Sequence, residues 1–190
     1  MEREKKMSFI RIEKNDGIAV LTLSRGKVNA INGAVVDELR DCLKSIEGDR
    51  DVKAVILTGA GKFFSFGFDI PEFLSFPRER FTEFMTSFAD LYSYVFLYPK
   101  PVIAALNGHT MAGGCMLALA CDYRVMARGK GKISLNEIGF GASVLAGTVE
   151  MLRFVAGSAQ AQSILYSGAL YSAEEAFGMG LVQELAEEAN

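Results

Sequence analysis

The 190-residue chain is poor in the residue types that several common kinds of site require. It has three cysteines, Cys42, Cys115 and Cys121, and all lie in apolar segments. An odd number placed in this way argues against a disulfide framework and favours a reducing compartment. The single histidine, His109, lacks cysteine or histidine neighbours at metal-ligand spacing and has no evident serine partner. We therefore predict neither a bound metal nor hydrolysis by a Ser-His-Asp triad.

Long apolar runs and blocks of like charge are also missing. No apolar stretch approaches the length that spans a bilayer, and the charged residues 1–6 have no apolar signal region behind them. A net charge of −3 without a charged tail gives no general attraction to nucleic acid. Half of the residues are hydrophobic and 23% are charged, as in globular proteins. We expect one cytoplasmic domain that binds neither membrane nor nucleic acid.

Extended and helical patterns alternate along the chain, which predicts an α/β fold. The first pattern is a hairpin, in which Asn15–Gly17 joins strands at Phe9–Glu13 and Ile18–Leu23. Further buried or short strands are predicted at Val52–Thr58, Val102–Leu106, Tyr123–Ala127 and Lys132–Leu135.

Helical spacing predicts three main helical regions. Asn32 can cap a helix that ends at Gly48, and a long amphipathic helix covers Phe81–Val95. Residues 143–190 are predicted to be mostly helical, with a capping box at Ser172–Glu175.

A glycine-rich stretch follows the predicted strand at Val102–Leu106. Ala112, Gly113 and Gly114 open an apolar helical segment there. A strand that runs through a glycine loop into a helix leaves backbone N–H groups free and pointing toward one spot. That spot can hold a phosphate, a carboxylate or a developing oxyanion.

Two other features could converge on the same point. The segment Lys62–Ile70 places four phenylalanines around Gly67, which suggests a backbone turn beneath a pocket. Glu137 lies between an extended segment and a glycine loop. Two backbone N–H groups can polarise a carbonyl, and a desolvated carboxylate can then remove its α-hydrogen. The residues thus favour enolate chemistry, although Glu137 could instead be a surface or capping residue.

At these positions the chain resembles the crotonase family, also called the enoyl-CoA hydratase/isomerase family, from Phe9 to about Val182. The resemblance implies a spiral of repeated β-β-α units over residues 1–142 and a shortened helical part over 143–190. It also implies an acyl-CoA thioester as substrate, no separate cofactor, and a homotrimer or a pair of trimers. The motifs that carry it are Asn29–Asn32, Phe64–Ile70, Pro99–Gly108 and Ala112–Arg124.

The resemblance also assigns site residues. It implies that the N–H groups of Phe68 and Gly113 form an oxyanion hole and that Glu137 is the acid/base. Lys27 and Lys62 flank segments that bind the CoA nucleotide in the family, although both could equally be solvated surface residues. The substrate and CoA contacts that it implies are Lys27, Asn29, Ala30, Lys62, Ser65, Gly67, Asp69, Ile70, Gly114 and Met116.

Met116 decides between the reactions of the family. Hydratases that resemble this chain carry a glutamate there, directly after the Gly-Gly-Cys segment, in addition to the one that maps onto Glu137. Adding water needs two groups, whereas shifting a double bond needs a single base. The resemblance therefore favours a 3,2-trans-enoyl-CoA isomerase. The alternatives are a hydratase or another lyase of the family, and a non-catalytic acyl-CoA-binding protein. A side chain as large as that of Phe68 would narrow or redirect the acyl pocket.

Overall fold

The computed structural model describes residues 8–187, which form two sheets and a set of covering helices. The larger sheet has the strand order β1-β2-β3-β5-β7-β9, and the smaller one has the order β4-β6-β8. The strands are β1 (Ile10–Asn15), β2 (Ile18–Leu23), β3 (Ala54–Gly59), β4 (Phe63–Ser65), β5 (Val102–Leu106), β6 (His109–Met111), β7 (Tyr123–Ala127), β8 (Ile133–Ser134) and β9 (Glu184–Ala186). The helices are α1 (Gly33–Glu47), α2 (Ile70–Phe73), α3 (Arg78–Phe96), α4 (Gly113–Leu119), the 3₁₀ helix η1 (Glu137–Phe140), α5 (Ala146–Ala156), α6 (Ser158–Ser167) and α7 (Ala173–Gly178).

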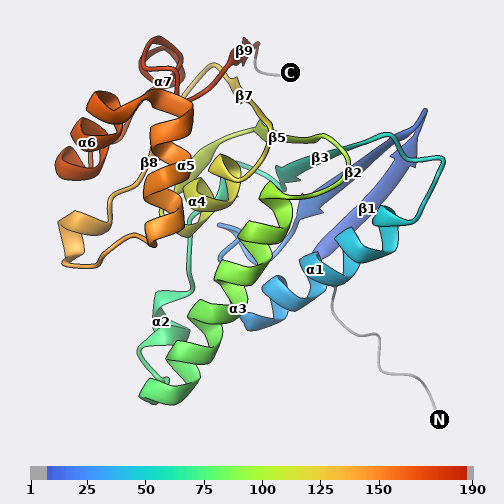
Figure 1. Ribbon diagram of the computed structural model, residues 1–190, viewed down its shortest axis with the longest axis horizontal. Coiled ribbons are helices and arrows are strands. Elements are labelled where there is room, and N and C mark those ends of the chain that lie inside the picture. The colour runs from blue at the N-terminus through green and yellow to red at the C-terminus, as the bar shows by residue number, and fades with distance from the viewer. Residues whose placement is uncertain (1–7, 188–190) are drawn as a thin grey trace.

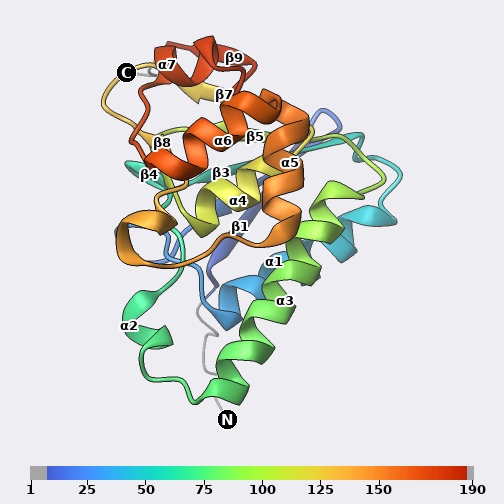
Figure 2. The same cartoon turned by 60° about the vertical axis from the view of Figure 1, so that its left-hand side comes forward.

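The chain repeats one unit of two strands and a helix. β3, β5 and β7 each add a parallel strand to the large sheet, and β4, β6 and β8 follow them as parallel strands of the small sheet. A helix comes after each pair. The sheets thus grow together, which confirms the predicted α/β spiral of β-β-α units. Figure 1 shows α1 and α3 side by side along the large sheet, with α5, α6 and α7 gathered near β7 and β9; Figure 2 shows the same grouping from a second side.

The N-terminal hairpin forms as predicted. β1 and β2 pair in antiparallel register through a turn at Asp16 and Gly17. Both turn residues have positive φ angles, 47° and 80°, as a two-residue hairpin turn with the right twist requires.

Capping residues and apolar spacing account for the helices. The Asn32 side chain accepts a hydrogen bond from Val35 N at 3.1 Å and begins α1, which ends at the Gly48 cap. The capping box at Ser172 and Glu175 is formed in α7. α3 buries Phe84, Phe88, Leu91, Tyr92 and Val95 in the apolar core, whereas Phe81, at the start of the predicted amphipathic helix, is exposed.

Several short elements were not predicted. β6 spans His109–Met111, where no strand was predicted, and β9 adds a strand within the region expected to be helical. α2 forms a single turn directly before α3, and β3 begins at Ala54 instead of Val52. Elements of three or four residues show no measurable periodicity, and neighbouring strands or caps stabilise them.

Arg124 joins the helix at the centre of the fold to the C-terminal segment. Its buried guanidinium donates to Cys121 O at 2.6 Å and to Leu181 O at 3.1 Å. The first of these carbonyls follows the C-terminal end of α4, where a cation is favoured electrostatically. Within residues 8–187, no helix is both long and apolar enough to cross a membrane.

Asn29 fixes the loop between β2 and α1 against the loop that precedes β4. Its side chain is buried, and its amide nitrogen donates to Ala60 O at 3.0 Å and to Phe63 O at 2.8 Å. Its oxygen accepts from Arg25 N at 3.2 Å. Its φ of 51° is one that asparagine tolerates better than most residues. One side chain therefore holds two chain segments together.

We predict that replacing Asn29 by glycine lowers the free energy of unfolding by about 2–4 kcal/mol, because buried carbonyls lose their donors while glycine still allows the positive φ. Denaturant unfolding measures the loss. Asn32→Ala, which removes the cap of α1 and the hydrogen bond from Asn32 Nδ2 to Glu72 Oε2, should cost about 1 kcal/mol. A loss for Asn29→Gly no larger than that of Asn32→Ala would contradict the proposed role of Asn29.

Candidate active site

Three loops leave the small parallel sheet side by side. The residues Gly67 and Phe68 follow β4, Gly113 follows β6, and Glu137 follows β8. β6 is the middle strand, and the Ala112 N–H, directly after it, donates to Ser134 O of β8 at 2.9 Å. Since all three strands run parallel, their carboxyl ends meet at one edge. The structure thus brings together the three features that were predicted to converge.

The loop after β4 touches the start of α4 at positions where only glycine fits. A Cβ atom built on Gly67 would lie 2.9 Å from Met111 O and 3.1 Å from Gly113 N. One built on Gly113 would lie 2.7 Å from Cε1 of Phe68, and one on Gly114 would lie 2.6 Å from Ser65 O. The absence of three side chains therefore allows the two backbones to approach each other closely.

The two predicted oxyanion-hole N–H groups are free. Ile31 N donates to Gly67 O at 2.8 Å and Asp69 N donates to Ile31 O at 3.0 Å, so the Phe68 N–H between them points away from that pairing. Gly113 is the first residue of α4, where N–H groups have no partner within the helix. Neither N–H donates to an acceptor within residues 8–187. Both groups can therefore bind an oxygen.

Glu137 is the only aspartate or glutamate that is buried among residues 8–187, with 5% of its surface exposed. Both carboxylate oxygens lack a hydrogen-bond partner in that part of the chain. Burial raises the pKa of this carboxyl, against a smaller lowering effect of its own backbone N–H. The interpretation of Glu137 as a surface residue is therefore wrong, and its environment suits a group that takes up a proton.

An electrostatic effect places Glu137 near the start of α4. The pKa of the Cys115 thiol is raised first by complete burial and second by the charge of Glu137. Cys115 lies in the first turn of α4, two residues after Gly113. The charge of Glu137 therefore acts on the first turn of α4, the turn that also carries the Gly113 N–H.

Three of the predicted substrate contacts have buried side chains. The Ser65 hydroxyl donates to Asn29 O at 2.8 Å and accepts from Gly67 N at 3.2 Å, so it holds the loop that carries Phe68. The Asn29 amide nitrogen donates to backbone carbonyls, as described above. The Met116 side chain lies in α4 and is 2% exposed. These buried side chains support the backbone of the site. Their direct contact with the substrate stays a prediction.

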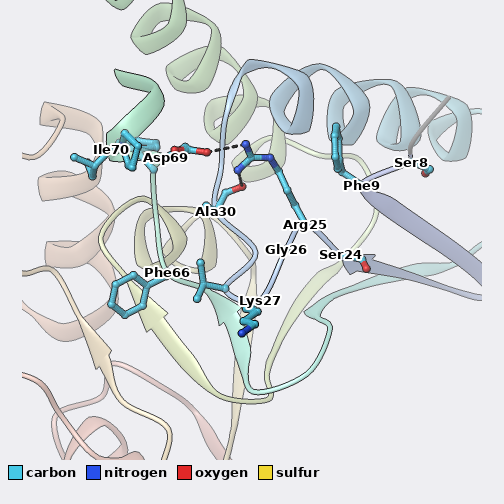
Figure 3. Close-up of a pocket in the computed structure, with 13 residues that line it drawn as sticks. Ser8, Phe9, Ser24, Arg25, Gly26, Lys27, Ala30, Phe66, Asp69 and Ile70 are labelled. Atoms are coloured by element: carbon cyan, nitrogen blue, oxygen red, sulfur yellow. Dashed lines mark hydrogen bonds and ion pairs between the residues drawn. The ribbon is translucent and has the colours of Figure 1, made fainter. Parts of the chain in front are cut away.

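A cavity of about 820 Å³ opens beside the loop that carries Phe68 (Figure 3). Four of the predicted substrate and CoA contacts line it, namely Lys27, Ala30, Asp69 and Ile70, together with the predicted oxyanion-hole residue Phe68. Gly113, Met116, Glu137 and Lys62 do not line it. The residues that line the cavity are Ser8, Phe9, Ser24, Arg25, Gly26, Lys27, Val28, Ala30, Phe66, Phe68, Asp69, Ile70 and Pro71.

Arg25 lines this cavity, although the sequence pattern did not predict it as a site residue. Its guanidinium lies 2.7 Å from Oδ2 of Asp69 and donates to Ala30 O at 3.2 Å (Figure 3). It also lies 3.5 Å from Oε2 of Glu72. Burial acts to raise the pKa of Asp69, but Arg25 and the Glu72 N–H together lower it. Two carboxylates thus neutralise Arg25, whereas Lys27 has no ion pair within residues 8–187.

Metal ligation finds no support in the geometry. Within the described part of the chain, no group of three or more histidine, cysteine, aspartate or glutamate side chains could hold an ion.

Comparisons with known proteins point to one family. A family model described as enoyl-CoA hydratase/isomerase matches residues 13–190. A Bacillus subtilis protein named probable enoyl-CoA hydratase is 35% identical over 178 residues, which cover 93% of this chain and 68% of that protein. The mouse mitochondrial enoyl-CoA delta isomerase 1 is 32% identical over 185 residues, 96% of this chain and 64% of that protein. A crystal structure of an enoyl-CoA hydratase from Bacillus anthracis matches with a TM-score of 0.91 and 30% identity, covering 95% of this chain and 71% of the other.

We predict that Glu137→Gln stabilises the protein increasingly as the pH rises. Below the ordinary glutamate pKa of 4.5, Glu137 is protonated in both the folded and the unfolded state. Above it, the unfolded state ionises first because the folded-state pKa is raised, so the wild type loses stability until the pH passes that raised pKa. Denaturant unfolding of both proteins between pH 4 and pH 8 measures the difference.

Glu174→Gln is the control with the opposite sign. Glu174 is exposed, and its own backbone N–H and Arg128 lower its pKa. Its contribution to stability is therefore present above pH 4.5 and disappears as the pH falls through its lowered pKa. A Glu137→Gln protein that is less stable than the wild type at pH 8 would contradict the picture of an unpaired buried carboxylate.

Proposed function

The chain belongs to the enoyl-CoA hydratase/isomerase family, and we propose that it moves the double bond of an enoyl-CoA from position 3 to position 2. An acyl-CoA thioester as substrate fits this family. The observation that carries the choice of reaction is the single buried carboxylate: Glu137 is the only one within residues 8–187, and Met116 occupies the position after Gly-Gly-Cys.

The reaction needs one base and one oxyanion hole. Glu137 takes the proton from C2 of the 3-enoyl thioester, and the electron pair of that C–H bond spreads onto the thioester oxygen. The N–H groups of Phe68 and Gly113 stabilise the negative charge on that oxygen. Protonated Glu137 then returns the proton to C4 while the double bond forms between C2 and C3. Atoms and charge balance without water and without a second acid or base.

Hydration is the second candidate, because several relatives at 34–35% identity carry the name hydratase. Water addition needs one group to deprotonate the water and one to protonate carbon. The thioether of Met116 can do neither, and its side chain is buried. A protein that binds acyl-CoA without turnover is the alternative from another class.

Assembly and location belong to the same proposal. The family resemblance favours a homotrimer or a pair of trimers, and the three free cysteines favour a location in the reducing cytoplasm. Large exposed apolar side chains on the C-terminal helices support an association of copies, among them Phe154, Tyr166 and Phe177.

We predict that Glu137→Gln abolishes isomerisation and leaves acyl-CoA binding intact. With trans-3-hexenoyl-CoA, the appearance of the conjugated 2-enoyl thioester measures kcat, which should fall by about 10³-fold or more because the acid/base is gone. In the wild type, the rate should rise with pH through a pKa above the ordinary glutamate value of 4.5.

Three other outcomes would change the assignment. Equal rates in wild type and Glu137→Gln would exclude Glu137 as the base. Addition of water to trans-2-hexenoyl-CoA at a rate that competes with isomerisation would favour the hydratase. Tight binding of acyl-CoA by the wild type without any turnover would favour the binding protein.

We predict that Gly67→Ala lowers kcat for the same substrate by about 10²-fold, because a Cβ there collides with Met111 O and Gly113 N and displaces the Phe68 N–H. Gly61→Ala is the matched control. Both glycines have positive φ, 92° and 72°, but a Cβ on Gly61 meets no atom within 4 Å. The control should keep kcat within about threefold, and an equal loss in both variants would count against the oxyanion-hole geometry.

A further inference from the structure

The ring of Phe68 fills the apolar space beside the candidate active site. Its centroid lies 4.7 Å from that of Phe88, 5.5 Å from that of Phe84 and 5.2 Å from that of Phe73. Phe84 and Phe88 belong to α3 and Phe73 to α2, and these helices lie next to each other in both views (Figures 1 and 2). The ring therefore packs the loop that follows β4 of the small sheet against α2 and α3.

Phe68 borders both the open cavity and the start of α4. Phe68 lines the cavity of about 820 Å³, whereas Gly113 does not. On its other side, the ring packs so closely on Gly113 that a Cβ there would lie 2.7 Å from Cε1 of Phe68. One residue thus supplies both a backbone donor for the thioester oxygen and a bulky wall next to it.

An acyl chain held by the Phe68 N–H begins within a few ångströms of this ring. A long chain gains affinity only where apolar surroundings replace water along its length. The apolar region that adjoins the Phe68 donor through its own side chain is the cluster of Phe68, Phe73, Phe84 and Phe88, and aromatic rings already occupy it. A long chain finds no free space there without displacing the Phe68 ring.

We propose that the side chain of Phe68 restricts this protein to acyl-CoA thioesters with short acyl chains. The inference rests on the proposed function in that it places the thioester at the Phe68 N–H. Replacing the ring by a methyl group leaves a space lined by Phe73, Phe84 and Phe88, and apolar cavities of this kind take up apolar ligands. Phe68→Ala is therefore expected to admit longer chains.

The test compares binding of butanoyl-CoA and decanoyl-CoA, which are saturated and require no chemistry, by titration calorimetry. The wild type should bind decanoyl-CoA less than tenfold more tightly than butanoyl-CoA. In Phe68→Ala, the preference for decanoyl-CoA should rise at least tenfold. Phe68→Leu, which keeps much of the bulk, should lie between the two.

Phe76→Ala is the matched control. The ring centroid of Phe76 lies 5.8 Å from that of Phe73, so Phe76 belongs to the same group of aromatic rings, but it does not line the cavity. Its preference should equal that of the wild type. A wild type that already binds decanoyl-CoA more than 100-fold more tightly, or equal shifts in Phe68→Ala and Phe76→Ala, would overturn the inference. So would a failure of the wild type to bind either thioester.

The inference and the proposed reaction can fail separately. A wild type that shows the expected binding pattern but does not convert trans-3-hexenoyl-CoA retains the role of Phe68 and loses the isomerase assignment. A wild type that isomerises 3-decenoyl-CoA as efficiently as 3-hexenoyl-CoA retains the reaction and overturns the role of Phe68.

Discussion

The parallel register of β4, β6 and β8 is the constraint on which the candidate active site depends. It places the residues that follow the three strands at one edge, so Phe68, Gly113 and Glu137 come from distant parts of the chain to adjacent positions. The register alone is not enough, because two backbones must also come close. Gly67, Gly113 and Gly114 allow this approach, since a Cβ on any of them would lie 3.1 Å or less from atoms of the facing segment.

The structure combines satisfied charges with a buried carboxylate that has no partner within residues 8–187. Arg25 is neutralised by Asp69 and Glu72, and Arg124 donates to buried carbonyls. Glu137 has no such partner within residues 8–187. A buried carboxylate without a donor destabilises the folded state, and the same desolvation raises its affinity for a proton. Burial of Glu137 therefore lowers the stability of the folded state and also raises the pKa of the carboxyl, which a base at this position needs.

Elements with a long apolar period or a capping signal were predictable, and short ones were not. β5 and β7 have the predicted bounds, Asn32 caps α1, and Ser172 begins α7. β6 and β9, with three residues each, exist because neighbouring strands offer hydrogen-bond partners. The role of Arg25 was missed for a similar reason: its carboxylate partners lie more than forty positions along the chain, and no local pattern links them.

The sequence by itself determined the α/β class, the glycine loops and the residue types of the candidate site, because these depend on periodicity and on backbone conformations that few residues adopt. It also left open whether Glu137 is a surface residue. Only the tertiary structure decided that Glu137 is buried, that its neighbours along β8 pair with β6, and that the Phe68 ring packs against α2 and α3. Burial and side-chain packing arise from contacts between segments far apart in the chain, so no local pattern specifies them.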